Sequence, residues 1–144
     1  MTLRTRRRST IAVAIVVAFS LIASGCTKNP ESAETAQLIN NERRARGIPE
    51  LHLNPTLIDK AQDWADHMAR QGRVSHSNLR QGIGTGWRYV GENVGWARSV
   101  GEMHSLFMAS TGHRSTMLDR RYSSYGVGVA VVNGRYYTVH VFAG

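Results

Sequence analysis

The chain has 144 residues, a formal net charge of +8 and 42% hydrophobic residues, which is enough for one domain with one core. Four arginines lie within the first 26 residues, so the net charge of the remaining chain falls to +4. This weakly basic balance gives little reason to expect nucleic-acid binding. The single cysteine, Cys26, excludes an intrachain disulfide, and it lies outside the expected domain.

The first 26 residues have the organisation of an export signal. Arginines precede an apolar run over residues 11–22, which is short for a membrane span. The run ends in Ala23-Ser24-Gly25-Cys26, which resembles the lipobox of bacterial lipoproteins and implies cleavage before Cys26 and lipidation of its sulfur. The alternative is an ordinary secretory signal and an unmodified thiol. We predict a signal peptide over residues 1–26, a polar tether over 27–32 and one domain over 33–144.

Two helices are predicted in the first half of the domain. Ser32 is expected to cap a helix ending near Arg46, and its Arg43-Arg44-Arg46 cluster is interpreted as a solvated face rather than an anion site. Asn54 and Pro55 begin a second helix that Gly72 ends. Its core face is predicted from apolar residues at helical spacing, namely Leu57, Ala61, Trp64, Ala65 and Met68.

A long irregular segment is predicted after the second helix. Ser75-His76-Ser77 opens it as a polar loop, and Gly91-Glu92-Asn93 follows. Long loops in compact domains are often functional. The aromatic and aliphatic residues around Glu92 either wall a pocket or fill the core.

A third helix and a short fourth helix are predicted next. The third helix covers Val100–Ala109, with Met103, Leu106 and Phe107 on its inner face. The short helix is expected to follow His113.

The chain is predicted to end in a hairpin. A strand over residues 125–132 carries Gly126, Gly128 and Ala130 on one face, which permits very close approach by another element. Asn133-Gly134 predicts a type I′ turn into a return strand over 135–142.

Three motifs in this order resemble the CAP superfamily, also called the SCP domain. They are Ser75-His76-Ser77, Gly91-Glu92-Asn93, and Ser110-Thr111-Gly112-His113-Arg114 before the Gly126-Val127-Gly128-Val129 strand. The resemblance covers about residues 35–142. It implies an α+β fold, a three-layer α-β-α sandwich with a small antiparallel sheet. It also implies a cleft with His76, Glu92 and His113.

Some positions depart from the pattern of this family. Ser110 stands where eukaryotic members often place a second glutamate, so we expect it to line the cleft in that residue's place. Phe107 and His140 stand where relatives commonly have tryptophan and glutamine.

The resemblance, rather than the spacing, is what places His76 beside His113. Two neutral imidazoles suit a divalent metal such as zinc, with Glu92 as a third ligand or as the group that fixes an imidazole tautomer. Two histidines are too few for a closed structural zinc site, so binding would be weak or completed by water. The same residues equally suit a hydrogen-bonded network that stabilises the fold.

The sequence favours a binding module over an enzyme. The resemblance implies a lipid, a sterol-like molecule or a protein as ligand. We expect a monomer, and the lipobox predicts that it is anchored on a bacterial envelope through Cys26. The runner-up is a metal-assisted hydrolase of peptide or envelope polymer, with Glu92 or a histidine as general base. No His-Glu-x-x-His motif supports it. A structural module of the envelope is the third hypothesis.

Overall fold

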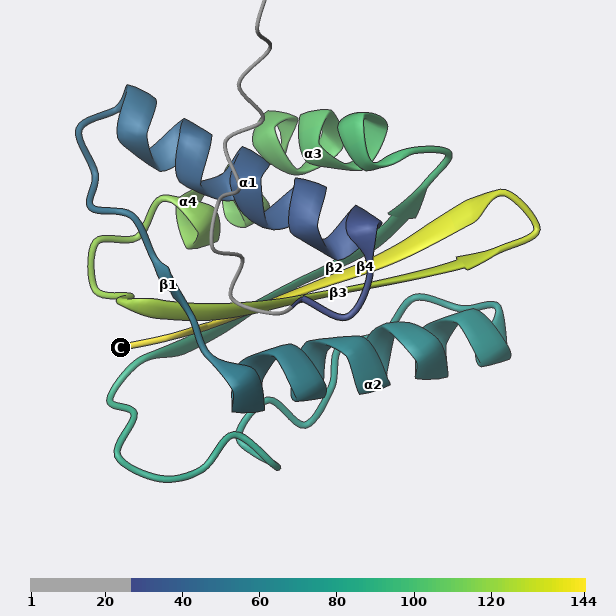
Figure 1. The fold of residues 1–144 in the computed structure, drawn as a ribbon, viewed down its shortest axis with the longest axis horizontal. Helices are drawn as coiled ribbons and strands as arrows, with labels where there is room; N and C mark the ends of the chain where they lie inside the picture. The colour runs from purple at the N-terminus through teal and green to yellow at the C-terminus, as the bar shows by residue number, and fades with distance from the viewer. Residues whose placement is uncertain (1–26) are drawn as a thin grey trace, which may run out of the picture.

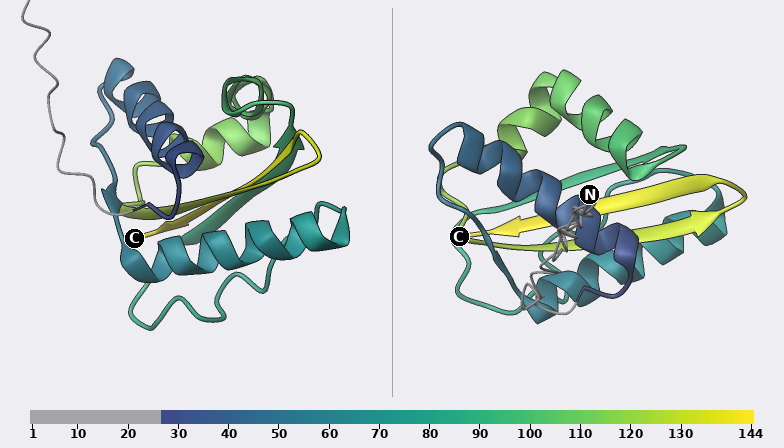
Figure 2. Two further views of the ribbon diagram at one scale, coloured as in Figure 1. Left: turned by 45° about the vertical axis from the view of Figure 1, so that its right-hand side comes forward. Right: turned by 45° about the horizontal axis from the view of Figure 1, so that its top comes forward.

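The computed structural model describes residues 27–144, and the predicted signal peptide and Cys26 lie outside this range. A four-stranded sheet forms the middle layer (Figure 1). Helix α2 (Pro55–Gln71) covers one face, and α1 (Pro30–Ala45), α3 (Val100–Ala109) and α4 (Thr111–Met117) cover the other (Figure 2). The predicted α+β sandwich is therefore confirmed. No helix within residues 27–144 is long and apolar enough to cross a membrane.

The sheet has the strand order β1-β3-β4-β2, so β2 lies at an edge. Its strands are β1 (His52–Leu53), β2 (Val90–Ala97), β3 (Ser124–Val132) and β4 (Arg135–Ala143). Strand β1 runs parallel to β3, and the other pairs are antiparallel. Asn133 and Gly134 both have positive φ, at 50° and 72°, which confirms the type I′ turn.

Helix α2 packs against the sheet through two glycines. A Cβ on Gly126 would lie 2.0 Å from the carbonyl carbon of Leu57, and one on Gly128 would lie 2.3 Å from that of Ala61. Both atoms belong to the backbone of α2, so only glycine fits at these positions. The predicted close approach is confirmed, and so is the helix itself, which Asn54 caps and which Gly72 ends in the left-handed conformation.

Helix α1 begins earlier than predicted. Asn29, rather than Ser32, is its N-cap, with the Asn29 side chain accepting a hydrogen bond from the Ser32 amide and Pro30 in the first turn. The predicted tether over residues 27–32 is therefore too long. An ion pair of 2.7 Å between Lys28 and Asp59 brings even Lys28 against the domain.

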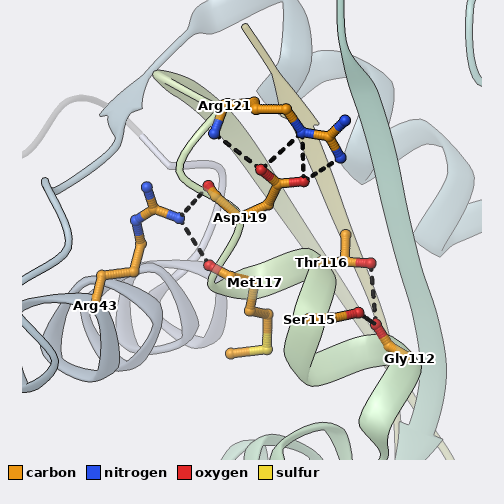
Figure 3. A network of polar contacts seen from close by, with 7 residues as sticks. All are labelled: Arg43, Gly112, Ser115, Thr116, Met117, Asp119 and Arg121. Carbon is orange, nitrogen blue, oxygen red and sulfur yellow. Dashed lines mark hydrogen bonds and ion pairs between the residues drawn. The ribbon is translucent and has the colours of Figure 1, made fainter.

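The sequence predicted a solvated helix face for Arg43, and this prediction is wrong. Its side chain is buried, and Nη1 donates to the carbonyl oxygens of Met117 and Asp119, each at 2.9 Å (Figure 3). Nε donates to the carbonyl of Pro49. Burial lowers the pKa of this guanidinium. Arg43 thereby fixes the C-terminal end of α4 against α1.

Two further predictions about the second half are wrong. Residues 90–97 form strand β2, where an irregular segment was predicted. Leu106 was placed on the inner face of α3, but it is 50% exposed, whereas Met103 and Phe107 are buried as predicted.

Candidate functional site

Glu92 is the most constrained polar residue of the candidate site. It projects from edge strand β2, and its side chain is only 3% exposed. Oε1 accepts a hydrogen bond from the Ser77 amide at 3.0 Å, and Oε2 accepts one from Ser77 Oγ at 2.6 Å. His76 Nδ1 lies 2.8 Å from Oε1. One carboxylate therefore holds the whole 75–77 loop against the sheet.

The contact with Glu92 determines which nitrogen His76 presents to solvent. A carboxylate accepts hydrogen bonds, so Nδ1 carries the proton in this contact. The neutral ring then has its lone pair on Nε2, and the side chain is 65% exposed. The loop thus presents an oriented, accessible Nε2.

His113 reaches the same edge of the sheet from the opposite face. It lies in the first turn of α4, and its carbonyl accepts a hydrogen bond of 3.0 Å from Asn93 Nδ2 on β2. Its ring packs on Phe107, with 4.8 Å between centroids. Burial lowers the pKa of His113, and a positive charge on His76 lowers it further. His113 is therefore neutral at pH 7, and it lies close enough to His76 for the two rings to interact electrostatically.

Ser110 has a structural contact in the site. It is the N-cap of α4, and its side chain accepts a hydrogen bond from the His113 amide. The fourth helix therefore begins before His113, whereas the sequence placed it after. Ser110 and Arg43 fix the two ends of α4, and through it the position of His113.

His140 belongs to the surroundings of the site, and no role was predicted for it. It pairs with Asn93 across β2 and β4, and only 1% of the residue is exposed. Its ring lies edge-on to Phe107 at 4.8 Å, and neither ring nitrogen has a hydrogen-bond partner within residues 27–144. Burial, with smaller contributions from His104 and His113, lowers its pKa to about 3. No local signal in the sequence predicts this burial.

Residues 36–143 match the family described as the cysteine-rich secretory protein family, CAP. The chain belongs to the CAP family. No curated protein matches its sequence significantly.

Solved structures show the same CAP fold at low sequence identity. An outer surface protein of Borrelia burgdorferi superposes with a TM-score of 0.71 at 13% identity, covering 78% of this chain and 91% of that one. A cysteine-rich secretory protein of Staphylococcus aureus has a TM-score of 0.64 at 25% identity, covering 81% of this chain but 39% of its own. The protein NaASP2, crystallised with Zn²⁺, has a TM-score of 0.59 at 12% identity, covering 83% and 82%.

The donor set of this CAP domain suits a weak metal site rather than a closed one. Within residues 27–144, no group of three or more His, Cys, Asp or Glu side chains is arranged to hold a metal ion. His76 and His113 offer two imidazoles, and Glu92 is engaged by the 75–77 loop. A metal held by these two rings would need water or a ligand to complete its coordination.

Proposed function

We propose that this CAP protein is exported, anchored to a bacterial envelope by a lipid on Cys26, and binds a ligand through the cleft formed by His76, Glu92, Ser110 and His113. The observation that carries the binding role is that Glu92 and the two histidines have different contacts. Its carboxylate is buried and engaged by the 75–77 loop, while the two imidazoles remain for a ligand.

In this proposal Glu92 is a positioning residue, and the histidines contact the ligand. His76 Nε2 and the neutral His113 ring accept a hydrogen bond from a polar ligand or bind a divalent cation. A bound Zn²⁺ would be held by these two rings and would attract an anionic or carbonyl group of the ligand. Zinc is a suitable probe, because NaASP2, which shares the fold, was crystallised with Zn²⁺.

The geometry supports binding better than hydrolysis. A general base must reach the proton of the attacking water. The Glu92 carboxylate already contacts the Ser77 amide, Ser77 Oγ and His76 Nδ1, so little of it remains for a water molecule. The envelope location is supported by the export signal and by the outer surface protein of Borrelia burgdorferi among the structural relatives.

Calorimetric titration of the chain from residue 27 with Zn²⁺ tests the binding role. We expect saturable binding that is lost in His76→Ala and in His113→Ala. His52→Ala is the matched control, because His52 is exposed on β1 and should leave binding unchanged. Zinc binding that persists in both cleft variants would contradict the proposed site.

Ligand class is tested with a fluorescent fatty acid and a fluorescent sterol. Saturable uptake of either would identify an apolar ligand. Turnover of a peptide or envelope polymer that both cleft variants abolish would instead establish the hydrolase. A structural module would respond in none of these assays.

A further inference from the structure

The exposed edge of β3 is covered at one point by side-chain amides. Strand β1 pairs only with Ser124 and Tyr125, so within residues 27–144 the rest of this edge has no neighbouring strand. At Val129, the amide donates to Gln62 Oε1 at 3.2 Å, and the carbonyl accepts from Gln62 Nε2 at 3.0 Å. Asn29 Nδ2 also donates to this carbonyl, at 2.8 Å. These contacts replace the hydrogen bonds that another strand would make.

Asn29 therefore fixes where the chain enters the domain. Its Oδ1 caps α1 while its Nδ2 binds β3, so the residue is held on two elements at once. Only Thr27 and Lys28 lie between Asn29 and Cys26. Three Cα–Cα steps reach about 10 Å at most. The attachment point of a lipid on Cys26 is consequently within about 10 Å of the Cα of Asn29, whose side chain binds Val129.

Exposed apolar residues line the same groove as Asn29. Asn29 and residues 129–132 line a common groove of about 560 Å³ with the end of α2. Val131 and Val132, at the tip of the β3–β4 hairpin, are 45% and 43% exposed. Figure 2 shows the start of the described chain passing beside the sheet between α1 and α2.

An aromatic residue and a cation lie at the same end of the sheet. Trp96, at the end of β2, is 42% exposed, and the Arg135 guanidinium lies 4.8 Å above its ring. In the sheet register, Tyr136 pairs with both Ala97 and Val131, so Trp96 is two strands away from the two valines. We call Trp96, Val131, Val132 and Arg135 the hairpin-end patch.

We propose that the hairpin-end patch contacts the phospholipid bilayer that carries the lipid of Cys26. The proposal rests on the lipid anchor proposed above. Valine and tryptophan side chains partition favourably into the bilayer interface, where tryptophan is enriched. Arg135 and the exposed Arg98 face anionic headgroups at this end of the molecule. The short connection to Cys26 holds the patch at the bilayer without a flexible spacer.

This orientation keeps the histidine cleft open to the outside. Glu92 pairs with Val141, whereas Trp96 pairs with Tyr137 nearer the hairpin. Four residues along the strand separate the two positions by about 13 Å. The cleft also lies at the β2 edge, opposite the β3 edge beside which the chain enters. A ligand therefore approaches the cleft from the solvent side of an anchored protein.

The test uses the full-length lipidated protein in vesicles of phosphatidylethanolamine and phosphatidylglycerol that contain nitroxide-labelled lipids. Lipidation blocks the sulfur of Cys26, the chain's one native cysteine, so Val132→Cys or Leu106→Cys supplies a single free thiol for a fluorophore. Leu106 is the control, because it is similarly exposed, at 50% against 43% for Val132, but lies on α3 rather than on the hairpin. We expect severalfold stronger quenching at position 132 than at position 106. Equal quenching would overturn the proposed orientation.

Mass spectrometry of the intact protein shows whether Cys26 carries a lipid, and so tests the proposed anchor separately from the proposed orientation. A chain that lacks the lipid on Cys26 contradicts both proposals. A lipidated, vesicle-bound chain whose position 132 is not quenched contradicts the orientation alone. A second readout needs no engineered thiol: brominated lipids should quench the native tryptophan fluorescence, and Trp96→Phe should abolish most of that quenching. Quenching that is unchanged in this variant would contradict contact through the patch.

Discussion

Acid should destabilise this domain through His140. The ring is buried between Phe107 and Phe142, and within the part of the chain that the structure describes neither nitrogen has a hydrogen-bond partner. Burial lowers its pKa from 6.5 to about 3, and the charges of His104 and His113 act in the same direction. The unfolded chain therefore takes up a proton at this residue at a higher pH than the folded domain does.

The size of the effect follows from linkage between protonation and folding. Above about pH 6.5 the ring is neutral in both the folded and the unfolded state, so in this range His140 contributes nothing to the pH dependence of stability. As the pH falls from about 6.5 towards 3, only the unfolded state binds the proton, and stability falls by about 1.4 kcal/mol per pH unit. Acidification to about pH 5 should therefore lower the free energy of unfolding by about 2 kcal/mol through this residue alone.

Urea unfolding at about pH 7.5 and about pH 5 measures this contribution. The variant His140→Leu keeps a buried apolar side chain and cannot be protonated. We expect the free energy of unfolding to fall by about 2 kcal/mol less in this variant than in the wild type. His52→Leu, on exposed strand β1, should retain the wild-type pH dependence. If His140→Leu loses as much stability on acidification as the wild type, the reasoning is refuted.

Two further predictions concern a glycine contact and a helix cap, and urea unfolding measures both. Gly128→Ala places a Cβ 2.3 Å from the carbonyl carbon of Ala61, so it should lower the free energy of unfolding by about 3 kcal/mol or more. The control Gly101→Ala meets open space and should cause no loss, and equal effects of the two variants would contradict the clash. Asn29→Ala removes the cap of α1 and the bond to the Val129 carbonyl, so it should lower the free energy of unfolding by about 1–2 kcal/mol and speed amide exchange at the first turn of α1. Unchanged stability and exchange would show that Asn29 does not fix the chain.

Local chemistry explains which parts of the fold were predictable. The ends of α2 depend on Asn54, Pro55 and Gly72, each of which acts within a few residues of its own position. The β3–β4 hairpin likewise depends on Asn133 and Gly134 at the turn itself. Such signals can be identified in the sequence because no distant residue is needed to satisfy them.

Strand β2 was not predicted because its formation depends on contacts with residues that are distant in the sequence. A Cβ on Gly91 would lie 2.4 Å from Tyr122 Oη, and one on Gly95 would lie 2.8 Å from the Met103 methyl group. Glycine is a poor strand former, yet here it leaves room for the side chains of Tyr122 and Met103, which would have to shift for any larger residue. The strand exists because β4 pairs with it along its whole length.

The same limit applies to the candidate site. Nothing in the spacing of His76 and Glu92 indicates their hydrogen bond, which depends on the return of the chain along β2. The burial of Arg43 depends on carbonyl oxygens of the last residue of α4 and of Asp119 just after it, and that of His140 on helices covering its face of the sheet. The family resemblance supplied the candidate residues and two possible roles for Glu92, and the contact between Glu92 and His76 Nδ1 matches the role of fixing the imidazole tautomer.

The most direct test of the cleft is a zinc titration followed by NMR of the imidazole nitrogens. We predict that the His76 and His113 resonances shift together and saturate at one zinc per chain, while His52 is unaffected. Glu92→Gln should weaken this binding by about 10- to 100-fold, because the oriented Nε2 is lost. If the two histidines respond at different zinc concentrations, or if neither responds more than His52, they do not form one binding site.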